Sequence, residues 1–306
     1  MSTQVNVLIL GATGTTGSSI VDALLVSGNF NVIAAVRPSS ATKSAVKALK
    51  PRGVEIRLVD FEKSSSEQLA EVLNGVDIVI STIEWTQLQL QRPLIDASKK
   101  AGVKRFIPCD WGTAGAHGIR NLHDKKLGER DYIKEIGLGY TFIDVGWWMQ
   151  LTLPIIDVAK AEYPMLFDAS RTIYGSGNVK NAVTDRRDIG SFVARIITDA
   201  RTQDRYVFIW GEEVTQNEVF ALAERISGKK FEAIHLSEDA LVETYKKAEG
   251  LTRVHIEYMY SIWVLGENTV ENAKKEEIGR ALDARQLYPD LKPRTLEEVA
   301  VEVYSD

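Results

Sequence analysis

The feature that most constrains this chain lies near its start, where an apolar run enters a turn with three glycines. Residues 5–17 read V-N-V-L-I-L-G-A-T-G-T-T-G, and residues 18–25 continue as a helix-like stretch. A side chain at Gly11 would obstruct the turn, Gly14 lets the backbone approach a pyrophosphate, and Gly17 lets the helix pack tightly on the sheet. Amides at the helix start, with the helix dipole, would hold the phosphates. This strand, turn and helix predict a dinucleotide-binding site.

The end of the second predicted strand, residues 31–36, indicates which dinucleotide binds. Arg37 follows this strand, where NAD-binding chains place an acidic residue for the ribose 2′-hydroxyl. A guanidinium suits a 2′-phosphate, because its planar fork can bond phosphate oxygens and lie against adenine. Lys43 adds a second positive charge, and no carboxylate lies between Arg37 and Val54. These residues favour NADPH over NADH; the alternative is two solvated surface cations.

Residues 5–145 alternate apolar strand-like runs with helix-like segments, the pattern of a doubly wound parallel sheet. The expected strands are residues 5–10, 31–36, 54–59, 77–82, 105–108 and 140–145, and two of the expected helices are residues 87–101 and 124–135. Beyond Gly146 the segments are shorter and mixed. We expect an α/β fold with an NAD(P)-binding Rossmann-like domain over residues 1–150. A smaller mixed α/β substrate-covering portion would follow over residues 151–306, with some segments returning to the first domain.

Composition excludes several classes of protein. The 306 residues are 44% apolar and 26% charged, as in ordinary globular chains. A net charge of -5 without a basic stripe argues against nucleic-acid binding. No apolar stretch is long enough for a membrane span, and no signal peptide precedes the first strand. With Cys109 as the single cysteine and four histidines without metal spacing, we expect a cytoplasmic protein without a metal site; a homodimer is compatible with the sequence.

Tryptophans gather where predicted strands end. In open α/β sheets, ligands bind beyond the carboxyl ends of the strands. Trp85, Trp111, Trp147 and Trp148, four of the six tryptophans, follow three such ends. Ordinary core aromatics are the alternative, but this clustering favours an aromatic-walled pocket for a flat, apolar or aromatic substrate. The pocket residues expected on this basis, with neighbours along the chain, are Trp85, Gln87, Trp111, His123, Trp147, Trp148 and Met149.

A proton donor or acceptor must also lie at this edge. Ordinary short-chain dehydrogenases use a Tyr-x-x-x-Lys pair, but Tyr132, Tyr140 and Tyr163 have no lysine four residues later, which argues against the commonest mechanism. The next candidates are Lys125 and Lys126, in the helix that follows the Cys109-Asp110-Trp111 loop. Position alone does not separate these two lysines. His123 lies three residues before Lys126 and could be a substrate contact or a second proton donor. The preferred interpretation is a solvent-exposed histidine at the helix start. Cys109 is interpreted as a small packed residue rather than a nucleophile.

At this point the chain resembles the NADPH-dependent isoflavone reductase-like enzymes, within the NmrA-like group of atypical short-chain dehydrogenases. That group includes isoflavone, pinoresinol-lariciresinol and phenylcoumaran benzylic ether reductases and eugenol synthase. The matching segments are G-A-T-G-T-T-G, V-R-P, V-D-I-V-I-S-T, K-R-F-I-P-C-D-W-G, G-Y-T-F-I-D-V, D-I-G and Q-L-Y-P-D-L-K. They extend along nearly the whole chain.

The resemblance implies roles for particular residues. The glycine turn and Arg37 would bind NADPH. The family's catalytic lysine lies in a K-x-x-x-R segment, and counting back from residues 137–141 places it on Lys126, with Arg130 as the trailing arginine. Lys126 would act as general acid or base while NADPH delivers hydride. The full set of expected cofactor contacts is Gly11, Thr13, Gly14, Thr15, Thr16, Gly17, Arg37, Lys43, Thr82 and Ile83.

Two departures from the family bear on the substrate. The family's P-S-E-F-G is P-C-D-W-G at residues 108–112, and W-W-M-Q at residues 147–150 is bulkier than in the plant enzymes. The function indicated is NADPH-dependent reduction of a small aromatic or conjugated metabolite. The alternatives are an NADP(H)-sensing regulator without turnover, and a dehydratase or isomerase on the same fold.

Overall fold

The computed structural model describes residues 4–61 and 63–305 of the chain. These residues form two compact units, each built from several segments. The first unit comprises residues 1–111, 125–144 and 187–207, and the second comprises residues 112–124, 145–186 and 208–306. Compared with a division at residue 150, the first unit lacks residues 112–124 and 145–150, which belong to the second unit, and includes the later segment 187–207.

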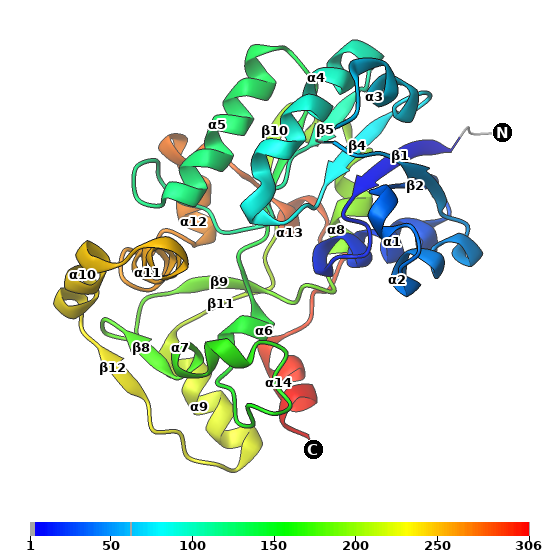
Figure 1. Cartoon of the computed structure of the whole chain (residues 1–306). Helices are drawn as coiled ribbons and strands as arrows, with labels where there is room; N and C mark the ends of the chain where they lie inside the picture. The colour runs from blue at the N-terminus through cyan, green and yellow to red at the C-terminus, as the bar shows by residue number, and fades with distance from the viewer. Residues whose placement is uncertain (1–3, 62, 306) are drawn as a thin grey trace. The chain divides into compact units, whose positions relative to one another are not determined.

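A five-stranded parallel sheet forms the centre of the first unit (Figure 1). Its strands, in the order β3-β2-β1-β4-β5, are β1 Val5–Leu10, β2 Phe30–Val36, β3 Glu55–Leu58, β4 Ile78–Ser81 and β5 Arg105–Ile107. The apolar runs of β1, β2, β4 and β5 are buried because helices cover both faces of a parallel sheet, and Leu8 and Ile9 are fully buried. The edge strand β3 is only partly buried, with Leu58 exposed. A parallel bridge from Phe106 to Tyr140 leads towards β6 Thr141–Asp144, and β10 Arg205–Phe208 is the neighbour of β6. The Rossmann-like α/β fold is confirmed.

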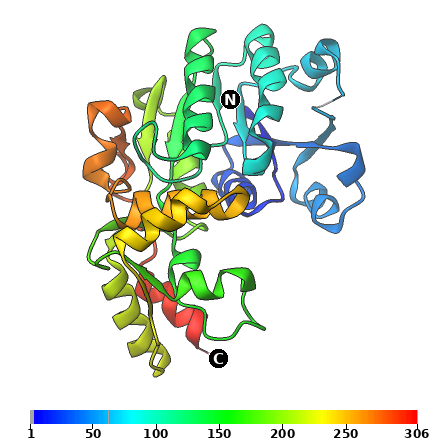
Figure 2. The ribbon, with the colours of Figure 1, turned by 60° about the vertical axis from the view of Figure 1, so that its left-hand side comes forward.

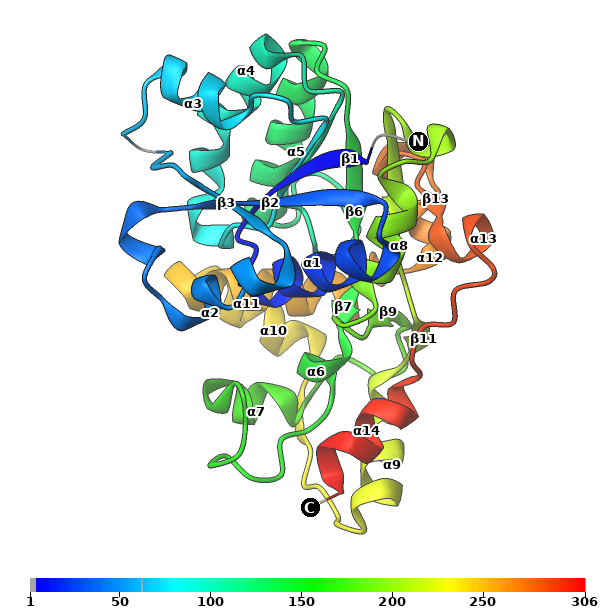
Figure 3. The same ribbon diagram turned by 90° about the vertical axis from the view of Figure 1, so that its right-hand side faces the viewer.

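The helices associated with this unit follow the predicted alternation. They are α1 Thr15–Ser27, α2 Ser44–Lys47, α3 Ser66–Val72, α4 Arg92–Ala101, α5 Asn121–Glu135, which begins in a second-unit segment, and α8 Ile189–Ile196. Figure 3 shows α1 beside α8, whose Gly190 lets the helices approach: a Cβ there would lie 2.0 Å from the Ser19 oxygen. Figure 2 shows α4 and α5 side by side, joined by the ion pair between Arg92 and Glu129 at 2.9 Å.

One predicted helix boundary is wrong. A helix was expected over residues 87–101, but Trp85–Gln91 forms a 3₁₀ segment with non-helical angles at Gln87. The α-helix α4 begins only at Arg92, with proline in its first turn. Proline suits that place because the first helical amides lack partners within the helix. The apolar spacing alone did not reveal this break.

The second unit has smaller sheets and more helices. Its strands are β7 Trp147–Trp148, β8 Thr172–Tyr174, β9 Asn181–Thr184, β11 Glu212–Val214, β12 Ile234–Leu236 and β13 Leu282–Asp283. Its helices are α6 Met149–Thr152, α7 Phe167–Ser170, α9 Gln216–Ser227, α10 Glu238–Lys247, α11 Gly250–Trp263, α12 Val270–Ala273, α13 Ala284–Leu287 and α14 Leu296–Tyr304. β9 pairs with β7 in parallel and with β11 antiparallel. Helices α9 and α14 lie side by side (Figures 1 and 3) over a buried apolar cluster that includes Met149 and Val299.

Candidate active site

The glycine turn joins β1 to α1 under tight steric constraint. Gly11 has φ +75°, and a Cβ there would lie 2.4 Å from the carbonyl oxygen of Thr82. A Cβ at Gly17 would lie 2.2 Å from the Gly11 oxygen. At Gly14 the nearest atom would be that same oxygen, at 3.2 Å. The turn therefore needs glycine at its first and third positions for backbone packing, while Gly14 has more room.

The start of α1 is open to an anion. Gly14 is the N-cap residue and offers no side-chain hydrogen bond to the helix. Among the described residues, no hydrogen bond is formed by the backbone amides of Thr15, Thr16 or Gly17. Such amides carry the positive end of the helix dipole and bind phosphate groups. Thr13 is exposed beside them.

Thr82 and Ile83 connect the end of β4 to this turn. The Thr82 hydroxyl and amide both donate to the Leu10 carbonyl, at 2.6 Å and 2.9 Å. The Ile83 carbonyl accepts a hydrogen bond from the Cys109 thiol at 3.0 Å. The ends of β1, β4 and β5 are thus tied together at one edge of the sheet, where ligands bind in open α/β sheets.

The two cations expected at the cofactor's 2′-phosphate lie beyond β2. Arg37 and Lys43 are both exposed. In the described part of the chain, neither side chain forms an ion pair or a hydrogen bond. Exposed cations without a carboxylate partner can accept a phosphate without first breaking an internal pair.

Burial separates the two candidate lysines of α5. Lys125 is exposed, whereas Lys126 is 7% exposed and its ammonium donates to the carbonyl oxygen of Asp110. Asp110 follows β5, so Lys126 lies at the same strand end as the thiol of Cys109. A lysine is seldom buried unless it is paired or used. The role of Lys126 in a reaction stays a prediction.

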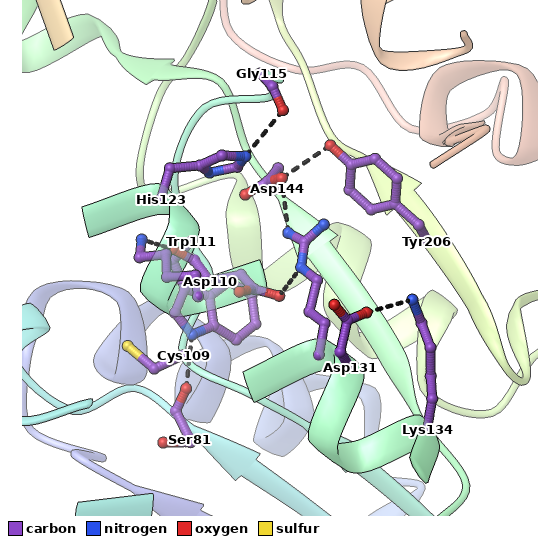
Figure 4. A network of polar contacts seen from close by, with 12 residues as sticks. Ser81, Cys109, Asp110, Trp111, Gly115, His123, Asp131, Lys134, Asp144 and Tyr206 are labelled. Carbon is purple, nitrogen blue, oxygen red and sulfur yellow. Dashed lines mark hydrogen bonds and ion pairs between the residues drawn. The ribbon is translucent and has the colours of Figure 1, made fainter. Parts of the chain in front are cut away.

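A buried charged network includes Asp110, the residue whose carbonyl binds this lysine (Figure 4). Arg130 donates to the Asp110 carboxylate from Nε at 2.9 Å and to the Asp144 carboxylate from a terminal nitrogen at 2.8 Å. The Tyr206 hydroxyl donates to the same Asp144 oxygen at 2.8 Å, and the Arg130 guanidinium lies 4.6 Å from the Tyr206 ring centroid. The segments that supply these residues are far apart in the chain.

Burial shifts the pKa values of the groups in and beside this network. Burial raises the pKa of Asp110 to about 6, although the neighbouring Arg130 and Lys126 oppose the shift. Burial also raises the pKa of Tyr206 well above its ordinary value. The pKa of the Cys109 thiol is raised to about 12 by burial, so it stays a thiol at neutral pH. Cys109 is 6% exposed, as expected of a packed residue; that it is not a nucleophile stays a prediction.

Trp111 adopts a backbone conformation that is unusual for its type. Its φ is +35°, and its buried indole N–H donates to the Ser81 carbonyl at the end of β4, at 2.7 Å. A bulky residue in this region costs roughly 1–3 kcal/mol and persists only where the surroundings impose it. The strained link joins Asp110 to Gly112, at the boundary between the first unit and the second.

The other predicted pocket residues are spread over both units. In the first unit, Trp85 is 39% exposed and Gln87 is half-buried. In the second unit, Trp147 and Trp148 are half-buried strand residues of β7. Met149 is fully buried in the apolar cluster with Leu153 and Val183, where it fills the core.

His123 departs from the preferred interpretation. It is 2% exposed, and its Nε2 lies 2.9 Å from the Gly115 carbonyl oxygen. The expectation of a solvent-exposed histidine at the helix start was therefore wrong. The loop at residues 113–115 covers the histidine. Sequence spacing could not reveal that loop's path.

The second unit holds a small aromatic cavity of about 90 Å³ that sequence reasoning only partly anticipated. Trp147, Trp263 and Phe220 line it. Its polar lining includes Tyr174, whose hydroxyl lies 3.1 Å from Nε2 of His255. Burial raises the pKa of Tyr174 to about 12 and lowers the pKa of His255, so both are uncharged at neutral pH. Tyr174 and His255 had no motif to mark them.

The described residues contain neither a metal-binding cluster nor a membrane-spanning helix. Across residues 4–61 and 63–305, no three histidine, cysteine or acidic side chains gather in a way that could hold a metal ion. Over the same residues, no helix has the length and apolar character needed to cross a membrane.

Comparison with known proteins places the chain among related proteins over its whole length. The sequence model of the NmrA-like family matches residues 3–300. Asnovolin J 5′,6′-dehydrogenase of Aspergillus novofumigatus is 36% identical over 98% of this chain and 95% of that protein. An isoflavone reductase-like protein of Olea europaea is 30% identical over 97% of this chain and 98% of that protein. Leucoanthocyanidin reductase of Vitis vinifera, solved with NADPH, has a TM-score of 0.84 at 25% identity and covers 98% of this chain and 100% of its own. The chain therefore belongs to the NmrA-like family, together with isoflavone reductase-like oxidoreductases.

Proposed function

We propose that this protein is an NADPH-dependent reductase that acts on a small aromatic or conjugated metabolite, with Lys126 transferring the proton. The observation that carries the proposal is the contrast within α5. Lys126 is buried at the strand end that follows β5, whereas its neighbour Lys125 is exposed. A buried amine beside the nucleotide-binding edge of a Rossmann-like sheet suits proton transfer.

The residues at the end of β1 fit a dinucleotide phosphate. The glycine turn leaves no space for side chains at Gly11 or Gly17, and the first amides of α1 lack partners among the described residues. Arg37 and Lys43 supply exposed cations where a 2′-phosphate would distinguish NADPH from NADH. When bound, NADPH supplies the hydride. Thr13, Thr15, Thr16, Thr82 and Ile83 complete the proposed contacts.

Lys126 would supply the proton. Its ammonium is held by the Asp110 carbonyl, and it can protonate the atom that gains electrons in the reduced product. The neutral amine can accept a proton in the opposite direction. Burial raises the pKa of the neighbouring Cys109 thiol, which makes it a weaker proton donor.

The proposed substrate class rests on the tryptophans and on the relatives. Trp147 and Trp263 line a cavity of about 90 Å³ in the second unit. As part of the same proposal, substrate contacts are assigned to Trp85, Gln87, Trp111, His123 and Trp148. Met149 is a fully buried core residue and would support the pocket without contacting the substrate. The relatives' names include an isoflavone reductase-like protein and pinoresinol-lariciresinol reductase.

A second candidate is the reverse reaction, in which NADP⁺ accepts hydride and a carbon–carbon double bond forms. It is favoured by the relative that is named as a 5′,6′-dehydrogenase. Lys126 would then act as the base. The residues of this chain serve either direction, so both must be assayed.

Cofactor choice is tested by calorimetric titration of NADPH and NADH. We expect wild type to bind NADPH more tightly, and Arg37→Ala to lose most of that preference. Lys47→Ala is the matched control, because Lys47 is an exposed cation in α2. Equal binding of both nucleotides to wild type and Arg37→Ala would contradict the assignment of Arg37.

Catalysis is tested with a panel of enones, quinone methides, imines and aromatic ketones, followed through NADPH absorbance, and with NADP⁺ for the reverse direction. Lys126→Ala should lower kcat by about 10²- to 10⁴-fold, the usual contribution of a general acid or base. Lys125→Ala, the exposed neighbour, should keep activity within about twofold. Wild type that binds NADPH but never consumes it would instead favour a cofactor-sensing regulator.

A further inference from the structure

The segment that holds Lys126 is itself fixed by side chains from both sides. The Asp110 carbonyl accepts a hydrogen bond from the Lys126 ammonium. The Asp110 carboxylate accepts a hydrogen bond from Arg130 Nε at 2.9 Å. The next residue, Trp111, is fixed by its indole bond to the Ser81 carbonyl at 2.7 Å. The peptide that carries the Lys126 acceptor therefore lies between two anchored side chains. Its rotation would require both anchors to move.

The surroundings of Asp110 are dry and balanced in charge. Asp110 is 2% exposed, Lys126 7%, Arg130 4% and Asp144 1%. One buried region thus holds two carboxylates, Asp110 and Asp144, and two basic side chains, Lys126 and Arg130. Removal of a single carboxylate would leave an uncompensated cation in a site of low dielectric constant. Lys126 is the cation that can respond, because an amine can lose its proton and a guanidinium cannot.

We propose that Asp110 is the positioning residue for Lys126: its carboxylate, held by Arg130, fixes the carbonyl that binds the lysine and keeps the lysine amine protonated. The effect of Asp110 on turnover rests on the proposed function, but the protonation of Lys126 can be measured without a substrate. Asp110 contacts Lys126 through its main chain and Arg130 through its side chain, so it acts through Lys126 and takes no proton from substrate itself.

Several titratable or charged groups lie around the Asp110 carboxylate. They are Cys109 beside it in the chain, Lys126 and Arg130 from α5, Asp144 from β6 and Tyr206 from β10. Cys109 and Tyr206 stay neutral at neutral pH because their pKa values are raised. The charges that act on the Lys126 ammonium are then the carboxylates of Asp110 and Asp144, which stabilise it, and the guanidinium of Arg130, which opposes it.

Nuclear magnetic resonance tests this inference without a substrate. In protein labelled with ¹³C-lysine, the Cε–Hε signal that disappears in Lys126→Arg belongs to Lys126. We expect this signal to titrate at a pH lower by about one unit in Asp110→Asn than in wild type, because the negative charge that favours the ammonium is gone. Asp110→Glu keeps the charge and should titrate close to wild type. The matched control is Asp96→Asn, which removes another carboxylate bonded to α5, through the Tyr132 hydroxyl at 2.5 Å.

Kinetics then separates positioning from general structural damage. With a substrate in hand, Asp110→Asn should lower kcat by about 10- to 100-fold, less than the loss expected for the lysine itself, with KM within about threefold. Asp110→Glu should recover most of kcat, and the pH profile of kcat should move with the titration of the lysine signal. Asp96→Asn should leave both the rate and its pH profile unchanged.

The outcomes distinguish the two proposals. If the Lys126 signal titrates at the same pH in wild type, Asp110→Asn and Asp96→Asn, the positioning role is refuted whatever the activity. If Asp110→Asn fails to fold, the same comparison is made with Arg130→Lys, which keeps a cation and loses the fork that holds both carboxylates. If the titration pH of the Lys126 signal shifts in Asp110→Asn but wild type turns over no substrate, the positioning role is supported and only the proposed reaction is overturned.

Discussion

Substitution of alanine for Gly17 should damage both stability and nucleotide binding. The added Cβ would lie 2.2 Å from the Gly11 carbonyl oxygen and 2.7 Å from the Thr82 hydroxyl, against an ordinary contact of 3.4 Å or more. The start of α1 must therefore move by about 1 Å. Overpacking of this kind costs roughly 1–3 kcal/mol, and the better helix propensity of alanine offsets about 1 kcal/mol. We expect Gly17→Ala to lose up to about 2 kcal/mol of unfolding free energy.

The assay is urea unfolding, with the midpoint compared at constant slope, together with calorimetric titration of NADPH. A shift of the first α1 amides should raise the Kd of NADPH at least about tenfold, which is roughly 1.4 kcal/mol. The control is Gly128→Ala, in the interior of α5, where a Cβ meets nothing within 4 Å. That variant should gain about 0.5–1 kcal/mol, with NADPH affinity unchanged.

The reasoning would be refuted by a Gly17→Ala protein as stable as Gly128→Ala that also binds NADPH normally. That result would mean that the turn can open without loss. A loss of stability with normal affinity would refute only the link between the turn and the phosphates.

Three further expectations concern buried polar groups. Arg105→Met should lose about 2–4 kcal/mol in urea unfolding, because buried Arg105 bonds the Ile196 and Asp199 carbonyls at 2.8 Å and 3.1 Å and its loss leaves acceptors without donors. Tyr206→Phe should lose about 1 kcal/mol in the same assay, since one hydrogen bond to a buried carboxylate disappears. Since the pKa of Asp110 is raised from 3.8 to about 6, the native state holds its proton more tightly than the unfolded chain. The unfolding free energy of wild type minus that of Asp110→Asn should therefore fall as pH rises from about 4 to about 6 and then level off; a rising difference in parallel urea titrations would contradict this sign.

The strands and the glycine turn could be predicted because their signals are local. Apolar runs of strand length, separated by helix-like segments, predicted every strand of the five-stranded sheet to within one or two residues. The turn was predicted from three glycines, since only glycine fits a positive φ at Gly11 and the close approach at Gly17. The break between Trp85–Gln91 and α4 was missed, because apolar spacing differs little between a 3₁₀ turn and an α-helix.

By itself, the sequence determined the parallel sheet, the glycine turn after β1 and the cation after β2, because each depends on residue type and spacing within a short window. Only the tertiary structure decided that Lys126 is buried while Lys125 is exposed, and that Asp110, Arg130, Asp144 and Tyr206 form one network. These residues come from β6, β10, α5 and the end of β5, and no pattern along the chain encodes their meeting. Burial and charge pairing are properties of the packed chain, so the environment of the candidate lysine emerges only when the strands and helices assemble.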